Sequence, residues 1–274
     1  MKLRRIDSEL VRRKMVRSRS HAQELIAQRR VLLDGQVVEK PARQMDPAQA
    51  LVITQGDDPD YVSRGAFKLA GALDALGEHA PIVQGRRCMD AGASTGGFTD
   101  VLLRRGAAHV AAVDVGHGQL DWKLRNDERV HCMEKCNIRF VEETDLTEKP
   151  SFFSIDVSFI SLKLVLPVVK KLTSLPGEVV CLIKPQFEAG REQVGKKGVV
   201  RDPKVHEEVI RTVLEFAASI GFSVEGLSFS PIKGPEGNIE YLAYLKYEGE
   251  ESGSLPEGME EKIRAITEES HREL

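Results

Sequence analysis

The sequence predicts a doubly wound α/β domain with a mostly parallel sheet, preceded by a small basic α+β domain. Strand-like apolar runs alternate with helix-like runs over residues 64–248, which is typical of βαβ units. A turn-rich polar segment over residues 55–63 predicts an interdomain linker after a first domain over 1–54. The remaining residues, 249–274, are expected to form a charged and partly helical tail. A length of 274 residues fits two domains of ordinary size.

The composition is that of a soluble globular protein, with 41% hydrophobic and 30% charged residues. No apolar run approaches the roughly 18 residues of a membrane-spanning helix, and the charged start lacks the apolar core of a secretory signal. We therefore expect a cytoplasmic protein without a membrane span, and a monomer. Its cysteines form no C-x-x-C pair, which favours reduced, buried thiols and no metal site. They are Cys88, Cys132, Cys136 and Cys181.

The charge is unevenly distributed along the chain. Residues 1–44 hold 12 Lys and Arg against 5 Asp and Glu, which leaves 27 basic and 37 acidic residues for the rest. A basic first domain favours a polyanionic partner such as RNA, although a merely solvated charged face is the alternative. The candidate RNA-binding residues are Arg4, Arg5, Arg12, Arg13, Arg17 and Arg19.

In the first domain, apolar spacing predicts two short helices followed by a hairpin and a closing strand. One helical stripe begins at Ile6, and a second follows the capping candidates Ser18 and Ser20. Asp34-Gly35 joins two apolar runs in the manner of a tight β-turn, because glycine adopts positive φ at little cost. A strand over 51–53 completes the unit.

In the second domain, helices are expected over 66–76, 98–104, 163–173 and 203–220. Strands are expected over 87–90, 109–114, 130–133, 152–156, 179–183, 223–230 and 240–245. Ligands of such sheets bind at the carboxyl ends of the strands. Leu120, Trp122 and Leu124 favour the core, with stacking of Trp122 on a base as the alternative.

A glycine-rich segment over residues 88–100 follows a predicted strand and opens a predicted helix. It has the spacing G-x-x-x-G-G, with Asp90 two residues before the first glycine, where a carboxylate would repel a diphosphate but receive a cationic amine. We infer a site for S-adenosylmethionine, in which Asp114 accepts the ribose hydroxyls. A purely structural turn is the alternative. The candidate cofactor-binding residues are Asp90, Gly92, Ser94, Thr95, Gly96, Gly97, Phe98 and Asp114.

Four ionisable residues stand at ends of predicted elements and outside the apolar pattern. Asp156 and Lys184 end two strands, so they should share the cofactor crevice. Lys68, from a preceding helix, and Glu240, from the last strand, should join them. Each residue alone would more often be an ordinary surface group, but four at strand ends favour an active site.

These residues and their motifs resemble the TlyA family of ribosomal RNA 2′-O-methyltransferases over nearly the whole chain. The shared motifs are the tetrad Lys68, Asp156, Lys184 and Glu240, residues 61–65 (YVSRG), 90–100 (DAGASTGGFTD), 113–116 (VDVG), 156–162 (DVSFISL) and 184–188 (KPQFE). The resemblance implies an S4-like domain for RNA, a Rossmann-like, FtsJ-type class I methyltransferase domain, and the tetrad as the catalytic set. It also implies methylation of cytidine ribose in 16S and 23S ribosomal RNA, and the basic start resembles actinobacterial-type members that act on both subunits. Ala66-Phe67 departs from the family pattern but leaves Lys68 in register.

In this interpretation, Lys184 acts as general base or stabilises the developing alkoxide, Asp156 orients it, and Glu240 positions Lys68 or the substrate hydroxyl. Two alternatives stay open. One is a ribosome-associated RNA-binding protein that retains the fold without turnover. The other is a membrane-active haemolysin, a name attached to this family, against which the lack of a spanning or strongly apolar amphipathic segment argues.

Overall fold

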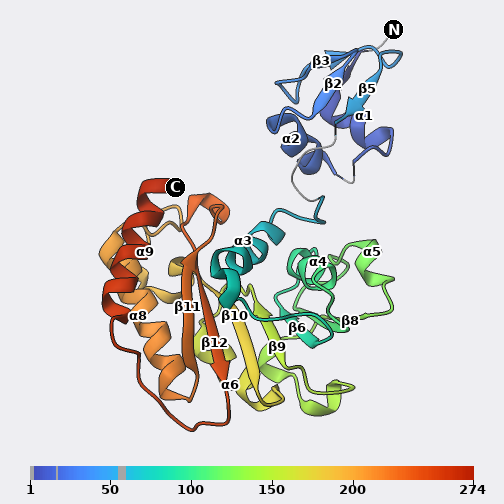
Figure 1. Cartoon of the computed structure of the whole chain (residues 1–274). Helices are drawn as coiled ribbons and strands as arrows, with labels where there is room; N and C mark the ends of the chain where they lie inside the picture. Colours follow the sequence, from blue (N-terminus) through green and yellow to red (C-terminus); the bar gives the residue numbers. More distant parts are fainter. Residues whose placement is uncertain (1–2, 17, 55–59) are drawn as a thin grey trace. The chain divides into compact units, whose positions relative to one another are not determined.

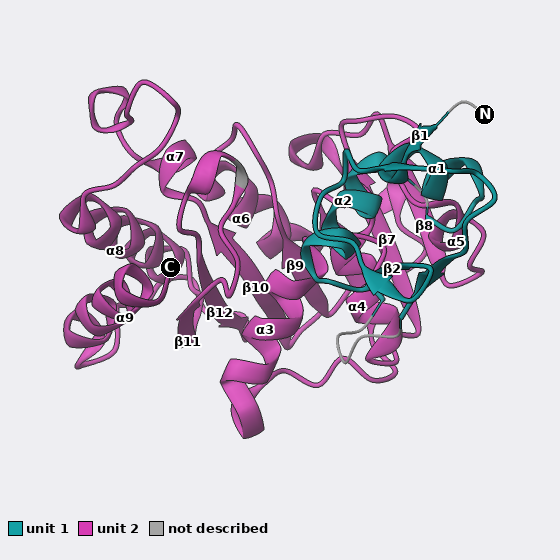
Figure 2. Ribbon diagram, turned by 90° about the horizontal axis from the view of Figure 1, so that it is seen from above, with its two compact units in different colours: residues 1–60 teal, residues 61–274 magenta. Residues whose placement is uncertain are grey.

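The computed structural model describes residues 3–16, 18–54 and 60–274, and these divide into two compact units (Figure 2). Unit 1 comprises residues 1–60 and unit 2 residues 61–274. Most of the predicted linker, residues 55–59, lies outside the described residues. Its last residues belong to unit 2, where the Val62 N–H donates to Asp100 Oδ2 at 2.9 Å.

Unit 1 is the predicted α+β domain. Its elements are β1 (Arg4–Arg5), α1 (Ile6–Arg12), α2 (Arg19–Ala27), β2 (Val31–Leu33), β3 (Gln36–Val37), β4 (Gln44–Met45) and β5 (Leu51–Ile53). Strand β2 pairs antiparallel with both β3 and β5, and Asp34-Gly35 forms the predicted turn with φ of 49° and 83°. Ser18 Oγ accepts the N–H of His21 and so caps α2, as predicted. The short β1–β4 ladder was not anticipated, because two-residue strands leave no periodic signal.

Unit 1 has its own apolar core, which both helices and the small sheet cover. Ile6 and Leu10 of α1 and Val31 of β2 are fully buried in it. Val11 and Met15, which belong to the predicted α1 stripe, are only partly buried against this core. Asp7 and Glu9 of the same helix are also buried, so α1 withdraws carboxylates as well as apolar side chains from solvent.

Unit 2 is the predicted doubly wound domain. Its helices are α3 (Ala66–Leu76), α4 (Gly97–Arg104), α5 (Trp122–Arg125), α6 (Leu162–Leu172), α7 (Pro185–Glu188), α8 (Pro203–Ser219) and α9 (Met259–Glu273). Its strands are β6 (Arg87–Ala91), β7 (His109–Asp114), β8 (Val130–Glu134), β9 (Phe152–Ile155), β10 (Gly177–Ile183), β11 (Ser223–Phe229) and β12 (Tyr241–Tyr247).

One seven-stranded sheet forms the centre of unit 2, in the order β11-β12-β10-β9-β6-β7-β8. Neighbouring strands from β10 to β8 pair in parallel, whereas β12 runs antiparallel to both β10 and β11. The chain winds outward from β6 to β8 and then returns to place β9 on the other side of β6. This reversal is the switch point at which such sheets bind their ligands.

Alternate residues of the central strands point to opposite faces of the sheet and pack into two apolar cores, one on each face. Met89 of β6 and Phe153 of β9 belong to the core covered by α6, α8 and α9. Cys88 and Phe152, their neighbours in sequence, belong to the core covered by α3, α4 and α5. Each face of the sheet is therefore covered by a layer of helices.

The expected C-terminal tail contains an element of the domain. Helix α9 lies beside α8 (Figure 1) and packs against α8 and β11. Its Met259 and Ile263 are buried in the core on that side of the sheet. Tyr241 of β12 hydrogen-bonds Ser270 of α9 at 3.0 Å in the same region. Residues 259–273 therefore complete one helical layer of unit 2.

Two further expectations are corrected. Trp122 lies on the surface with 75% of its area exposed, whereas Leu120 and Leu124 are buried as predicted. Of the four free thiols, only Cys88 and Cys181 are buried; Cys132 and Cys136 are half-buried. Among the described residues no helix is long and apolar enough to cross a membrane.

Candidate active site and cofactor pocket

The four predicted catalytic residues come together because of the direction of their strands. Asp156 follows β9 and Lys184 follows the parallel neighbour β10, so both stand at the same edge of the sheet. Glu240 precedes β12, and because β12 is antiparallel to β10, its beginning lies beside the end of β10. Lys68 enters from the first turn of α3.

The tetrad forms a chain of alternating charge. Lys184 Nζ contacts Asp156 Oδ1, Lys68 Nζ lies 3.8 Å from Asp156 Oδ2, and Lys68 Nζ donates to Glu240 Oε2 at 2.6 Å. Exposed fractions of these side chains are 7% for Lys184, 19% for Asp156, 9% for Lys68 and 0% for Glu240. Two ammonium groups are thus largely withdrawn from water, which is tolerated only because each faces a carboxylate.

Next to the tetrad lies a pocket of about 610 Å³ at the carboxyl ends of β6, β7 and β9. Its lining includes Gly92, Ser94, Asp114, Asp156 and Ser158. A volume in this range suits a ligand of nucleoside size. Because Asp156 and Ser158 also contact Lys184, the pocket and the tetrad share a wall.

Asp114 and Gly92 shape this pocket. The Asp114 carboxylate accepts the N–H of Ser94 at 2.8 Å and the N–H of Gly116 at 2.6 Å, so its orientation is fixed. Gly92 has φ of 86°, and a Cβ there would overlap the carbonyl of Asp156. Only glycine therefore allows the turn after β6 to approach the end of β9 this closely.

Asp90 takes a place other than the predicted one. The sequence predicts that it faces a cationic amine, but the structure buries it completely beneath the loop, outside the pocket lining. Its oxygens accept Thr99 Oγ1 at 2.7 Å and Ser154 Oγ at 3.1 Å. Burial raises the pKa of Asp90 to about 7, against the lowering effect of these hydrogen bonds. Asp90 therefore ties β6 to α4 and β9.

Of the other predicted cofactor-binding residues in this loop, one lines the pocket and the rest pack behind the loop. Ser94 lines the pocket, whereas Thr95, Gly96, Gly97 and Phe98 do not. A Cβ at Gly96 would overlap Leu124, and one at Gly97 would overlap Ser63. Phe98 is buried in the core beside α3. These positions let α4, α5 and the segment before α3 pack closely against the loop.

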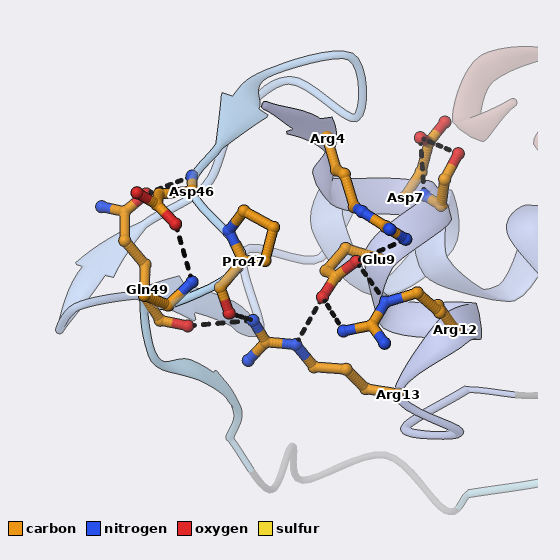
Figure 3. Close-up of polar contacts among 10 residues, drawn as sticks. Arg4, Asp7, Glu9, Arg12, Arg13, Asp46, Pro47 and Gln49 are labelled. Atoms are coloured by element: carbon orange, nitrogen blue, oxygen red, sulfur yellow. Dashed lines mark hydrogen bonds and ion pairs between the residues drawn. The ribbon is translucent and has the colours of Figure 1, made fainter. Parts of the chain in front are cut away.

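In unit 1 the described members of the predicted RNA-binding set pair with one of two buried carboxylates, Glu9 or Asp7. Figure 3 shows Arg4, Arg12 and Arg13 around Glu9. Glu9 pairs with Arg12 at 2.6 Å and with Arg13 at 2.9 Å, and Arg4 lies 3.7 Å away. Arg13 also donates to the carbonyl of Pro47, which fixes it to the fold. Arg12 and its hydrogen bonds lower the pKa of Glu9 to about 2.

Asp7 is the second centre. It pairs with Arg5 at 2.7 Å and with Arg19 at 3.0 Å, and these bonds hold its pKa well below the usual range. Arg17 lies outside the described residues. The guanidinium side chains remain 41–55% exposed at Arg4, Arg5, Arg12 and Arg19, but only 22% exposed at Arg13. Unit 1 therefore presents at least four oriented cations to solvent.

Comparison with known proteins now assigns both units. Residues 61–247 match the family model for FtsJ-like methyltransferases, and residues 4–49 match that of the S4 domain. The chain belongs to the FtsJ-like methyltransferase family. The predicted fold class and the prediction of an enzyme are thereby confirmed.

Several relatives are similar to this FtsJ-like methyltransferase over nearly the whole of both chains. YqxC of Bacillus subtilis, which carries the name of an rRNA methyltransferase, is 46% identical over all of this chain and 96% of its own. The 16S/23S rRNA (cytidine-2′-O)-methyltransferase TlyA of Mycobacterium tuberculosis is 46% identical over 96% of this chain and 97% of its own. A solved Streptococcus thermophilus protein named as a hemolysin matches with a TM-score of 0.77 and 44% identity, covering 100% of this chain and 97% of that one.

Several residues that contact the tetrad or line the pocket were not predicted from the sequence. Gln186 donates to Glu240 Oε1 at 3.1 Å, and Ser158 accepts Lys184 Nζ at 3.2 Å. Both stand within two residues of a tetrad member in a quoted motif, so their position was the available signal. Phe159, at φ of 62° and 90% exposed, lies at the pocket against Phe187 with 4.8 Å between ring centroids.

Proposed function

We propose that this chain transfers a methyl group from S-adenosylmethionine to the 2′-hydroxyl of cytidine ribose in ribosomal RNA. The observation that carries the proposal is the alternating chain Lys184–Asp156–Lys68–Glu240, which shares a wall with a nucleoside-sized pocket. Relatives with 46% identity carry the names of rRNA methyltransferases, and one of those names specifies cytidine-2′-O transfer. The proposal joins that chemistry to these four side chains.

The residues of the pocket fit S-adenosylmethionine better than a phosphorylated cofactor. Its wall carries the carboxylates of Asp114 and Asp156, which repel phosphates and attract a cationic amine or sulfonium. Asp114 uses one bond per oxygen for backbone N–H groups, so each oxygen can accept a ribose hydroxyl as well. When bound, S-adenosylmethionine supplies an electrophilic methyl group on a positively charged sulfur.

Lys184 is the tetrad member best able to reach a substrate hydroxyl at the pocket. Both of its polar contacts, Asp156 and Ser158, line the pocket wall. A ribose hydroxyl is a poor nucleophile, so its proton must leave as the oxygen bonds to the methyl carbon and the carbon–sulfur bond of the donor breaks. As an ammonium group, Lys184 holds that oxygen and stabilises the negative charge that develops on it, while the proton passes to water. As a neutral amine, Lys184 takes the proton itself.

The other three residues keep Lys184 in place. Asp156 orients the Lys184 ammonium, and Lys68 balances the second oxygen of Asp156 at 3.8 Å. Glu240 neutralises Lys68, and Gln186 fixes Glu240 from the other side. Such preorganisation matters because correct placement of reacting groups can account for about 7–11 kcal/mol of a barrier.

Unit 1 is proposed to supply most of the affinity for RNA. Its exposed arginines can neutralise backbone phosphates, which releases counterions and makes binding dependent on salt. Phosphate contacts give position without sequence selection, so the choice of nucleotide must come from other contacts. The proposed substrate is ribosomal RNA, free or within a subunit.

The decisive experiment follows labelled methyl groups from S-adenosylmethionine into ribosomal RNA. The wild-type chain should label the 2′-oxygen of cytidine, and Lys184→Ala should not. The exposed lysine variant Lys204→Ala serves as the matched control and should label normally. RNA binding by the wild type without any transfer would favour a non-catalytic RNA-binding protein.

We further propose action on both 16S and 23S RNA, as in the name of the mycobacterial relative. Sequence identity does not show whether this chain is of the type that acts on both subunits, because the Bacillus and mycobacterial relatives are both 46% identical to it. Mapping of 2′-O-methyl marks in cells with and without the gene tests this point. Loss of a mark from one subunit only would reject dual specificity.

A further inference from the structure

Glu134, the last residue of β8, accepts three consecutive backbone N–H groups from the loop that follows Asp114. The donors are Gly118 to Oε2 at 2.9 Å, and Gln119 and Leu120 to Oε1 at 3.0 and 3.3 Å. Its side chain is 10% exposed. A carboxylate that collects successive loop N–H groups holds the loop in one conformation.

Two basic side chains complete the surroundings of Glu134. Arg125 of α5 donates to Oε1 at 2.6 Å, and His117 Nδ1 lies 3.3 Å from Oε2. The backbone N–H of Gly118, followed by Arg125 and the other N–H groups, lowers the pKa of Glu134 to about 2. The carboxylate is therefore ionised throughout the neutral range.

The same loop forms one wall of the cofactor pocket. It begins at Asp114, whose carboxylate accepts the Gly116 N–H, and it contributes Val115 and Gln119 to the lining. Residues 117–119 are exposed and Val115 is 69% exposed, so the core contributes little to their placement. Polar bonds must hold this loop, and Glu134 supplies most of those that the structure records for residues 117–120.

Glu134 also connects the loop to the glycine-rich turn. Arg125 belongs to α5, whose Leu124 fills the space that a Cβ at Gly96 would need. The Asp121 N–H, just before α5, donates to the carbonyl of Thr95 at 3.1 Å. Glu134, α5 and the glycine-rich turn thus form one continuous support for the pocket side that contains Asp114.

We propose that Glu134 is a positioning residue of the cofactor site, which holds loop 115–120 so that Asp114 and Gln119 face the adenosine part of S-adenosylmethionine. This inference rests on the proposed function. It assigns Glu134 no contact with the cofactor and no part in proton transfer. Its effect should therefore fall on cofactor affinity rather than on the chemical step.

The test uses the full chain with S-adenosylhomocysteine as the calorimetric probe. Glu134→Gln keeps the shape of the side chain but removes the charge, and Glu134→Ala removes the acceptors. We expect roughly tenfold weaker binding for Gln and a larger loss for Ala, because the loop must then be ordered on binding. The matched control is Asp127→Asn, which alters a nearby carboxylate that is paired with Arg129 and lies outside the pocket lining; its affinity should be unchanged.

Amide hydrogen exchange gives a second readout that needs no cofactor. In the Glu134 variants, the amides of residues 118–120 should exchange faster, while those of β6 and β7 keep their protection. At saturating methyl donor, the Glu134→Gln variant should retain the wild-type kcat and show a raised KM for the donor. A kcat that falls while affinity is kept would overturn the assignment.

The failure of this inference can be told from the failure of the proposed function. Equal probe affinity in the wild type and in the folded Glu134→Gln variant would reject the positioning role alone. No uptake of the probe by the wild type would reject the cofactor and the role together. Unchanged exchange at residues 118–120 would show that Glu134 does not hold the loop.

Discussion

The two units use buried carboxylates in opposite ways. In unit 1, Asp7 and Glu9 are fully buried, while all of their arginine partners except Arg13 have side chains that are about half exposed. In unit 2, Glu240 is buried and its partner Lys68 is buried as well. In the proposed function, carboxylates beneath exposed guanidinium groups orient cations for RNA, whereas carboxylates beside buried ammonium groups serve methyl transfer.

The choice of cation follows from this difference. Arginine keeps its charge under all conditions and presents a planar fork that can bind a carboxylate and a phosphate at the same time. Lysine concentrates its charge on one nitrogen, which can exchange a proton when it is withdrawn from water. Arg12 beside Glu9 and Lys184 beside Asp156 are the two cases in this chain.

The largest expected effect is the loss of methyl transfer in Lys184→Ala, which removes the cation that contacts Asp156 and Ser158 of the pocket wall. We expect at least about a 10³-fold fall in kcat, because proton removal and charge stabilisation both depend on this group. Asp156 keeps Lys68 at 3.8 Å, so the fold should persist. Single-turnover transfer to ribosomal RNA measures the effect.

In the same variant, calorimetry should find S-adenosylmethionine affinity within about twofold of the wild type, since Lys184 is not part of the pocket lining. A variant that turns over at a near-normal rate would remove Lys184 from the mechanism. If the variant also loses affinity for S-adenosylmethionine, Lys184 takes part in cofactor binding, and the tetrad and the pocket form one binding site.

Much of unit 2 could be predicted from its sequence because parallel strands bring their carboxyl ends to one edge. That rule alone placed Asp156 beside Lys184, and the antiparallel β12 then brings Glu240 to them. The rule did not predict the position of Asp90. Its side chain is turned away from the pocket and hydrogen-bonds Thr99 of α4 and Ser154 of β9. The direction of a side chain at a strand end depends on the pleat, which a glycine-rich sequence does not reveal.

Unit 1 was harder to predict in its polar detail. The spacing of Glu9 to Arg12 and Arg13 is i+3 and i+4, a known pairing signal on helices, but the arginines were interpreted as a free surface. The bond from Arg13 to Pro47 joins residues 34 positions apart, and nothing local indicates it. Net charge therefore predicted a polyanion partner but could not separate structural from exposed arginines.

The second prediction concerns acid stability and sharpens the comparison in unit 1. The folded pKa of Glu9 is lowered from 4.5 to about 2, so its stabilising contribution is present above pH 4.5 and is lost as pH falls toward 2. Glu9→Gln should therefore lower the stability of unit 1 at pH 7 by about 1–2 kcal/mol, with little difference from wild type near pH 2. Hydrogen exchange of the α1 amides measures it.

The control for Glu9 is Glu39→Gln, which removes a carboxylate whose side chain is 66% exposed and paired with Arg29. Its effect should stay below about 0.5 kcal/mol at any pH. If both variants behave alike, the buried position of Glu9 adds nothing to its pairing, and the contrast between the two units loses its basis.

A smaller effect is expected from single arginines on RNA binding. Arg12→Ala should weaken binding severalfold and reduce the slope of log K against log salt by about 0.7–0.9, the value for one phosphate contact. Arg13→Ala should leave that slope unchanged and instead lower the stability of unit 1, because Arg13 is 22% exposed and bound to the carbonyl of Pro47. Filter binding across a salt series separates the two. If the slope of Arg12→Ala also equals that of the wild type, Arg12 makes no phosphate contact and serves the fold, as Arg13 does.

The smallest effect is expected at Trp122, and it decides whether unit 2 also adds affinity for RNA. Helix α5 buries Leu124 and leaves Trp122 75% exposed, because residues two positions apart on a helix point in different directions. Trp122→Ala should therefore change the stability of unit 2 by less than about 0.5 kcal/mol, whereas a core tryptophan would cost about 3–5 kcal/mol. If thermal unfolding is unchanged but RNA affinity falls, the indole contacts RNA, and the division into a binding unit and a chemical unit must be relaxed. If neither changes, RNA affinity stays with the arginines of unit 1.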